Sequence, residues 1–275
     1  MALFKISYYS NALGLNTSAT VSIPQKIDTF LTKGPRKTSD GMIPVLWLLH
    51  GMGDDCTGWQ RYTNLEKYTE ARGIAVAVPE VSSLCFYANM KKGLPYLDFI
   101  ADEFPATIRD FFPQLSEKPE YNMIAGCSMG GYGAIKVALN HPERFGAVGC
   151  FSSGNFCELE LPPIEMAPLF MKPIYTVPEV AFGVPEFKDS AGTEDDLYYL
   201  FDKAVKAGKK IPRIIQYDGN QDWLMYASDK LAAFLKNNSK HGDFSYEKWD
   251  GEHNWQFWDQ CLPKFLDACG FDSLL

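Results

Sequence analysis

The sequence predicts an α/β fold in which helices cover both faces of a mostly parallel central sheet. Continuous apolar runs at 43–49 and 73–78 are typical of strands that are buried on both faces. Farther along the chain, such strands alternate with segments of helical apolar spacing, as expected of a parallel sheet. A chain of 275 residues is a common size for one open-sheet domain, so a single domain over 1–275 is expected.

The individual elements follow in order along the chain. The segments 2–9 and 15–23 are predicted to be the two strands of an opening hairpin. Apolar residues at helical spacing over 97–112 predict a helix, with a kink or break at Pro105. The remaining elements are strands at 121–127, 145–152, 212–217 and 244–249, and helices at 130–140, 224–236 and 255–268.

The stretch 155–205 does not follow this alternation. It is rich in proline. It follows the strand predicted at 145–152, so it starts at the edge of the sheet where loops build pockets in such folds. Its aromatic residues suit the lining of a small-molecule site, so we predict a lid-like insertion. The alternative is a surface loop that packs its aromatic side chains into the core. The aromatic residues concerned are Phe156, Phe170, Tyr175, Phe182 and Phe187.

The strongest signal for chemistry is the sequence Gly-Cys-Ser-Met-Gly-Gly at 126–131, which contains the pattern G-x-S-x-G. Its glycines permit a sharp turn from strand to helix that presents the serine in strained geometry. A predicted strand precedes the pattern and a small-sided helix follows it, whereas the alternative is a glycine-rich turn with an incidental serine. A phosphate-binding loop does not fit, because Lys136 is not placed as G-K-[ST]. We therefore predict the α/β-hydrolase fold with Ser128 as the nucleophile.

A serine nucleophile needs a base within hydrogen-bond reach, and the chain contains four histidines. In α/β-hydrolases the histidine follows the last strand, and this order favours His253, which lies between the last predicted strand and the last helix. His241 lies in a polar turn before that strand, and His141 precedes a proline at the end of a helix. His253 is therefore the expected general base.

The third member of the triad is expected in the loop after the penultimate strand, which offers two carboxylates. Asp218 precedes a glycine and could simply shape the turn. Asp222 lies just before the next helix, where it could also act as a cap. We favour Asp222 as the residue that fixes the tautomer of the imidazole and stabilises the imidazolium.

The tetrahedral intermediate also needs hydrogen-bond donors that point at its oxyanion. One donor in this fold is the amide that follows the nucleophile, here Met129. The other comes from the loop after an earlier strand, and the Met52 amide is the best placed there. His50, in the same loop, is then expected to organise the loop rather than to act as a base.

Composition excludes several other classes of function. The net charge of −8 and the lack of a Lys/Arg stripe argue against a nucleic-acid partner. No apolar run approaches the roughly 18 residues of a membrane span, and the N-terminus lacks the features of a signal peptide. Seven cysteines without repeated CxxC spacing favour reduced thiols in a cytoplasmic protein. We expect no metal and no organic cofactor, and the sequence is silent on oligomeric state.

These motifs resemble the esterase D group of α/β-hydrolases, which includes S-formylglutathione hydrolases, tributyrin-type, acetyl and feruloyl esterases and, more distantly, mycolyltransferases. The resemblance rests on 48–52, 124–134 and 251–255, the last followed by Trp258, and covers most of the chain from about residue 43 onward. Cys127 stands where many relatives have histidine, which bears on substrate preference and not on the triad. The resemblance implies Ser128, Asp222 and His253 as the triad, with the Met52 and Met129 amides as the oxyanion hole.

The resemblance further implies a carboxylesterase, a serine hydrolase of short-chain acyl or aromatic (feruloyl- or cinnamoyl-type) esters, with a small-molecule ester as its partner. The pattern is closer to the tributyrin-type and feruloyl esterases than to the S-formylglutathione hydrolases. A thioester hydrolase of that second kind, or an acyl transferase with the same triad, is the alternative. A binding protein without activity is disfavoured, because it has no need for a triad in the correct chain order. The segment 155–205 is expected to cover Ser128 and set acyl specificity.

Overall fold

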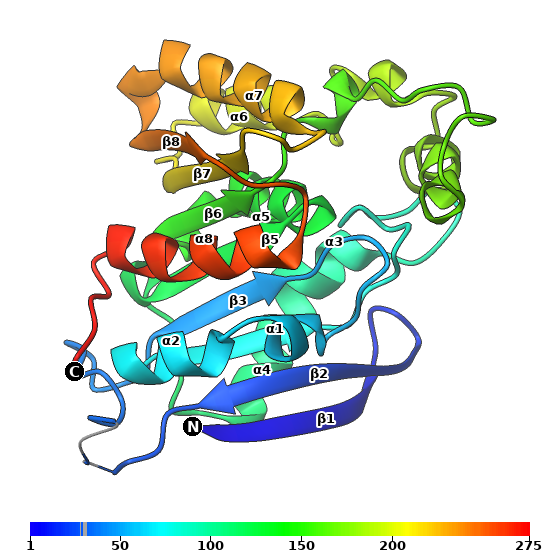
Figure 1. The fold of residues 1–275 in the computed structure, drawn as a ribbon. Coiled ribbons are helices and arrows are strands. Elements are labelled where there is room, and N and C mark those ends of the chain that lie inside the picture. Colours follow the sequence, from blue (N-terminus) through cyan, green and yellow to red (C-terminus); the bar gives the residue numbers. More distant parts are fainter. Residues whose placement is uncertain (28, 30–31) are drawn as a thin grey trace.

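The computed structural model describes residues 1–27, 29 and 32–275, which form an eight-stranded sheet with helices on both faces (Figure 1). The strand order is β1-β2-β4-β3-β5-β6-β7-β8. Strand β2 runs antiparallel to both of its neighbours, and every other neighbouring pair is parallel. The predicted mostly parallel α/β sheet is thus confirmed. The strands are β1 Ala2–Ser10, β2 Leu15–Ile23, β3 Val45–Leu49, β4 Ala75–Pro79, β5 Asn122–Cys127, β6 Ala147–Phe151, β7 Arg213–Gly219 and β8 Phe244–Trp249.

Two hydrophobic cores lie on opposite faces of this sheet. One face is covered by α1 Gly58–Tyr62, α2 Leu65–Arg72 and α8 Trp255–Ala268. The other face is covered by α3 Tyr96–Asp98, α4 Phe104–Phe111, α5 Met129–Asn140, α6 Leu197–Lys206 and α7 Met225–Asn237.

Strand β3 shows why a continuous apolar run is needed at the centre of the sheet. Successive side chains of a strand point to opposite faces. Val45 and Trp47 therefore join one core, while Leu46 and Leu48 join the other. Every residue of β3 is at most 3% exposed.

The structure adds helices that the sequence pattern did not predict. Helices α1 and α2 precede β4, and the short α2 buries only Leu65, Thr69 and Arg72. The helix predicted over 97–112 continues through Pro105 without a break, because that residue lies in the first turn of α4. The irregularity precedes it as a π-helical turn, Phe99–Glu103, where the Phe104 N–H bonds to the Phe99 carbonyl.

After β6 the chain leaves the sheet, and we call the segment 155–196 the insertion. It consists of short 3₁₀ and π turns beyond the carboxyl ends of the parallel strands (yellow-green at the right of Figure 1). Helix α6, which overlaps the end of the predicted range 155–205, belongs to the layer beside α5. The aromatic residues of the insertion divide into two kinds: Phe182 and Phe187 are each 4% exposed, whereas Phe170 is 76% exposed. Whether the insertion moves as a lid stays a prediction.

Within the described part of the chain, no helix has the length and apolar character needed to cross a membrane. The seven cysteines are all described, and none forms a disulfide.

Candidate active site

Ser128 occupies the sharp turn between β5 and α5. Its backbone has φ 53° and ψ −124°, a conformation that residues other than glycine rarely adopt. The flanking glycines allow this turn. A Cβ on Gly126 would lie 2.5 Å from the Gly130 carbonyl, and a Cβ on Gly130 would lie 2.5 Å from the Leu49 carbonyl oxygen. Strand, turn and helix therefore meet at distances that only glycine permits, and the serine stands clear of the sheet.

The structure brings the three predicted triad residues together. The His253 Nε2 atom lies 2.9 Å from the Ser128 hydroxyl oxygen. On the other side of the ring, His253 Nδ1 lies 2.9 and 3.0 Å from the two carboxylate oxygens of Asp222. The Asp222 side chain is fully buried, and that of His253 is 17% exposed. With Nδ1 as donor to the carboxylate, Nε2 is free to accept the serine proton.

The surroundings of Asp222 keep it ionised. Burial alone would raise the pKa of its carboxyl. The hydrogen bond and charge of His253 outweigh burial, with further hydrogen bonds from the Leu224 N–H at 2.8 Å and from Ser152, so the pKa lies below its ordinary value. The carboxylate can therefore stabilise an imidazolium.

The second candidate carboxylate, Asp218, has a different environment. It is fully buried at the end of β7, and one of its oxygens accepts the Gly219 N–H at 2.8 Å. Burial, followed by the nearby charge of Asp222, raises the pKa of Asp218 to about 7. The structure thus places Asp218 at the end of β7 and Asp222 against the histidine.

The two predicted oxyanion donors lie beside the serine. Met52 and Met129 line the same pocket as Ser128. Within the described chain neither backbone N–H has an acceptor, and the Met129 amide is at the free N-terminal end of α5. Both amides are thus available to a ligand in this pocket.

His50 holds the loop that carries Met52. Its Nε2 accepts the Val81 N–H at 3.3 Å, and its Nδ1 donates to the Gly51 carbonyl at 2.9 Å. Burial lowers the pKa of this ring, which favours the neutral form. This is the organising role expected from the sequence.

A pocket of about 670 Å³ opens over Ser128 and His253. Its lining is mostly apolar and comes from the loops after β3 and β4, the start of α5, the insertion, the loop before α7, and the segment from His253 into α8. Among the described residues that line it, Asp54 is the only acidic one, and no lysine or arginine is present. The apolar lining consists of Met52, Phe86, Met129, Phe156, Phe170, Met171, Pro173, Ile174, Trp223, Leu224 and Trp258.

Residues 20–268 match a family model described as putative esterase, which covers most of the chain. The chain belongs to this esterase family. It is similar to an acetyl esterase of Caldicellulosiruptor saccharolyticus, with 27% identity over 97% of each chain. The predicted enzyme class, a carboxylesterase, is thereby confirmed.

Solved structures of serine hydrolases and esterases have the same fold as this chain. A substrate-bound fluorophosphonate-binding serine hydrolase of Staphylococcus aureus, FphF, superposes with a TM-score of 0.79 at 31% identity, over 98% of each chain. An S-formylglutathione hydrolase of the same organism superposes with a TM-score of 0.76 at 30% identity, again over 98% of each chain. A ferulic acid esterase, at 20% identity and a TM-score of 0.74, shares the fold. The α/β-hydrolase fold and the predicted group of relatives are confirmed.

The histidine of this esterase is held by residues that sequence reasoning did not assign to the site. Trp258 packs edge-on against His253 at 5.2 Å, and Trp223 packs on it at 5.4 Å between ring centres. The indole N–H of Trp258 donates to the Ser152 hydroxyl at 2.9 Å, and Ser152 in turn hydrogen-bonds to Asp222. Ser152, at φ 51°, carries no sequence pattern that indicates this role, whereas Trp258 belongs to the apolar side of the last predicted helix and to the family resemblance.

The other histidines of the esterase lie apart from this pocket. His141 lies 4.0 Å from the Glu143 carboxylate, just after α5. His241 packs against the ring of Phe201, with 6.3 Å between ring centres. Neither lines the pocket that contains Ser128.

Proposed function

We propose that this esterase hydrolyses neutral esters of short-chain or aromatic acids through an acyl-enzyme on Ser128. The observation that carries the proposal is the chain of hydrogen bonds from Ser128 through His253 to Asp222 at the base of an apolar pocket. As the serine oxygen attacks the ester carbonyl, His253 Nε2 takes the hydroxyl proton. Asp222 stabilises the imidazolium that results.

The rest of the cycle uses the same groups. The Met52 and Met129 amides donate to the oxygen of the tetrahedral intermediate. When this intermediate collapses, the bond to the alcohol breaks and His253 gives its proton to the leaving oxygen, which leaves the acyl group on Ser128. Water then attacks the acyl-enzyme, His253 takes a proton from that water, and the acid is released as the serine regains its proton.

The charge of the pocket supports neutral substrates. A carboxylate buried among these apolar side chains would need a cationic partner, and the described lining offers no lysine or arginine. Asp54, whose pKa is raised by burial, would repel an anionic substrate when it is ionised. S-formylglutathione is an anionic thioester, so the pocket favours uncharged esters over it.

The thioester hydrolase remains a second candidate because a solved S-formylglutathione hydrolase is 30% identical to this chain. Steady-state kinetics with p-nitrophenyl acetate, p-nitrophenyl butyrate, a feruloyl ester and S-formylglutathione separate the two. We expect a higher kcat/KM for the neutral esters. A clear preference for S-formylglutathione would reverse the assignment.

The covalent step has its own test. Since FphF is a fluorophosphonate-binding enzyme, a fluorophosphonate should react with this chain as well. The serine oxygen would displace fluoride from phosphorus, and mass spectrometry should find one adduct on the peptide that contains Ser128. Ser128→Ala should show neither adduct nor turnover. Labelling at another residue, or normal turnover by Ser128→Ala, would overturn the acyl-enzyme mechanism.

A further inference from the structure

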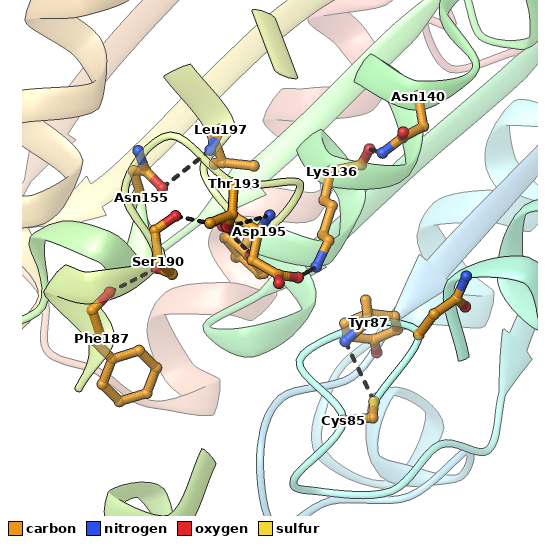
Figure 2. Close-up of polar contacts among 12 residues, drawn as sticks. Cys85, Tyr87, Lys136, Asn140, Asn155, Phe187, Ser190, Thr193, Asp195 and Leu197 are labelled. Carbon is orange, nitrogen blue, oxygen red and sulfur yellow. Dashed lines mark hydrogen bonds and ion pairs between the residues drawn. The ribbon is translucent and has the colours of Figure 1, made fainter. Parts of the chain in front are cut away.

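Helix α5 carries a fully buried lysine behind the active site. Lys136 lies eight residues after Ser128 on the same face of the helix, with Tyr132 between them. Its ammonium group is 2.5 Å from an oxygen of Asp195, and the two side chains are 1% and 12% exposed (Figure 2). A buried ion pair thus joins the nucleophile helix to the last part of the insertion.

Further hydrogen bonds hold Asp195 in place from both sides. The Tyr132 hydroxyl donates to the Asp195 carbonyl at 2.6 Å. The Thr193 hydroxyl accepts the Asp195 N–H at 3.2 Å, within the turn that presents the carboxylate to Lys136 (Figure 2). At the other end of the insertion, Asn155 donates to the Asp196 carboxylate at 2.7 Å. Both ends of the insertion are therefore fixed to each other, and one end is fixed to α5.

A short series of ring contacts links the ion pair to the pocket. The ammonium of Lys136 lies 5.3 Å from the ring centres of Tyr132 and of Phe182. Tyr132 packs edge-to-face against Phe156 at 5.1 Å, and Phe156 packs in the same way against Phe86 at 4.9 Å. Phe86 and Phe156 line the pocket. The ion pair therefore lies one layer beneath this apolar wall.

Stability alone does not account for a buried ion pair here. Two buried charges lose hydration, and a well-packed apolar pair of similar volume is often equally or more stable. What the charges add is a distance requirement, because the ammonium and the carboxylate compensate each other's lost hydration only in direct contact, whereas apolar side chains can also pack at shifted positions. The pair thus selects one position of the insertion over α5.

We propose that Lys136 and Asp195 are positioning residues that hold the Phe86–Phe156 wall in place and so limit the size of the acyl group that the pocket accepts. This inference rests on the proposed ester hydrolysis and concerns the selectivity of the same site. The chemistry at Ser128 does not depend on the pair, since neither residue lines the pocket.

The test replaces the pair by apolar residues of similar volume, Lys136→Met with Asp195→Leu. The measured quantity is kcat/KM for p-nitrophenyl hexanoate divided by that for p-nitrophenyl acetate. We expect this ratio to rise about tenfold, mainly through a lower KM for hexanoate, because the wall can then yield to a longer chain. The rate with acetate should change by less than about threefold, and the melting temperature by only a few degrees.

Two more variants complete the design. Lys136→Gln with Asp195→Asn removes both charges and leaves polar side chains in their places, so it should raise the ratio in the same direction by roughly threefold, and it serves if the apolar variant does not fold. The matched control is an exposed ion pair, in which the Lys203 ammonium lies 2.8 Å from the carboxylate of Glu194. Glu194 is the residue directly before Asp195. Lys203→Gln with Glu194→Gln should leave the ratio unchanged.

The outcomes separate this inference from the proposed function. Hydrolysis of the acetate by the wild-type enzyme tests the function alone. If the wild type is active and the folded variants show an unchanged or lower ratio, the positioning role is wrong and the ester hydrolysis stands. A uniform loss of rate with both esters and a large fall in melting temperature would show that the pair is merely structural.

Discussion

The residues proposed to perform the chemistry and those that shape the pocket are held in place by different means. Ser128, Asp222 and His253 follow β5, β7 and β8 of the parallel run β5-β6-β7-β8, and backbone hydrogen bonds tie the strands of this run together. The Gln221 N–H also donates to the Gly251 carbonyl at 3.0 Å. The described part of the insertion contains no strand, and packed rings and the Lys136–Asp195 pair hold it, together with two backbone hydrogen bonds, from the Lys91 and Lys92 N–H groups to the Ala181 and Val180 carbonyls at 3.0 and 2.9 Å.

This difference separates rate from selectivity. Backbone pairing depends little on which side chains are present, so the strand ends that carry the triad keep their positions through most changes around them. Ring packing depends on every side chain that takes part. Changes at the triad should therefore slow all esters alike, while changes in the insertion should alter their order of preference.

The largest expected effect is that of Asp222→Asn. The amide can neither hold the imidazole in the required tautomer nor stabilise its charge, so kcat should fall about 10⁴-fold for short and long esters alike. Steady-state kinetics with the acetate and hexanoate esters check this. The kcat of Asp218→Asn should fall by less than about tenfold, because the hydrogen bond of Asp218 goes to the Gly219 N–H, whereas His253 is bonded to Asp222. The reverse order of the two variants would give the catalytic role to Asp218.

A backbone change at the nucleophile turn should come next. A methyl group on Gly130 would lie 2.5 Å from the Leu49 carbonyl oxygen, so the turn has to shift in Gly130→Ala. A displacement of about 1 Å at the reacting atoms costs roughly 10²-fold in rate. We expect kcat/KM to fall by that factor for both esters, with slower fluorophosphonate labelling of Ser128. Rates equal to those of the wild type would mean that the turn tolerates a side chain.

Two phenylalanines of the insertion should differ in what their loss affects, selectivity for Phe170 and stability for Phe182. Phe170 lines the pocket and is 76% exposed, whereas Phe182 is 4% exposed and does not line it. Phe170→Ala should change kcat/KM for aryl esters about tenfold, equal to about 1.4 kcal/mol of lost contact, and leave the acetate rate and melting temperature nearly unchanged. Phe182→Ala should cost about 3–5 kcal/mol of stability. If Phe170→Ala lowers all rates and the melting temperature, the predicted lid role is wrong.

The smallest effect concerns pH and Asp218. In the native protein its carboxyl keeps a proton up to about pH 7, whereas in the unfolded chain it ionises near its ordinary pKa of 3.8. Between these values the unfolded chain binds fewer protons, so this group makes the native state less stable as the pH rises. Asp218→Asn removes that dependence. The melting temperature of the variant relative to the wild type should increase by roughly 5 °C from pH 4 to pH 7, and a constant difference would contradict the raised pKa.

The mostly parallel sheet and the meeting of Ser128, Asp222 and His253 could be predicted from the sequence because their signals are local. The apolar run of β3 and the glycines around Ser128 each lie within a few residues. The prediction does not separate helix α6 from the proline-rich range 155–205, although Leu197, Leu200 and Phe201 have helical spacing. Helix α2 has no apolar pattern that predicts it, because it buries a narrow face that includes Arg72.

Other features could not be predicted because their partners are far apart in the chain. Lys136 and Asp195 are separated by 59 positions, and no local pattern indicates that a charged helix residue will be buried. The same holds for Ser152 and Trp258, which are separated by 106 positions. Such pairs are determined by tertiary packing.

The two ends of the insertion are joined by hydrogen bonds, which allows such enzymes to diversify there. Asn155 bonds to Asp196 and also accepts the Leu197 N–H, so the two points where the insertion leaves and rejoins the sheet layers are already together. Lengthening a loop whose ends are fixed costs little entropy, about 0.6 kcal/mol for each doubling of its length. The stretch between these points can therefore be lengthened, shortened or exchanged as a unit while the strands keep their register. A lineage built on this frame can acquire a new acyl preference without rebuilding its catalytic residues.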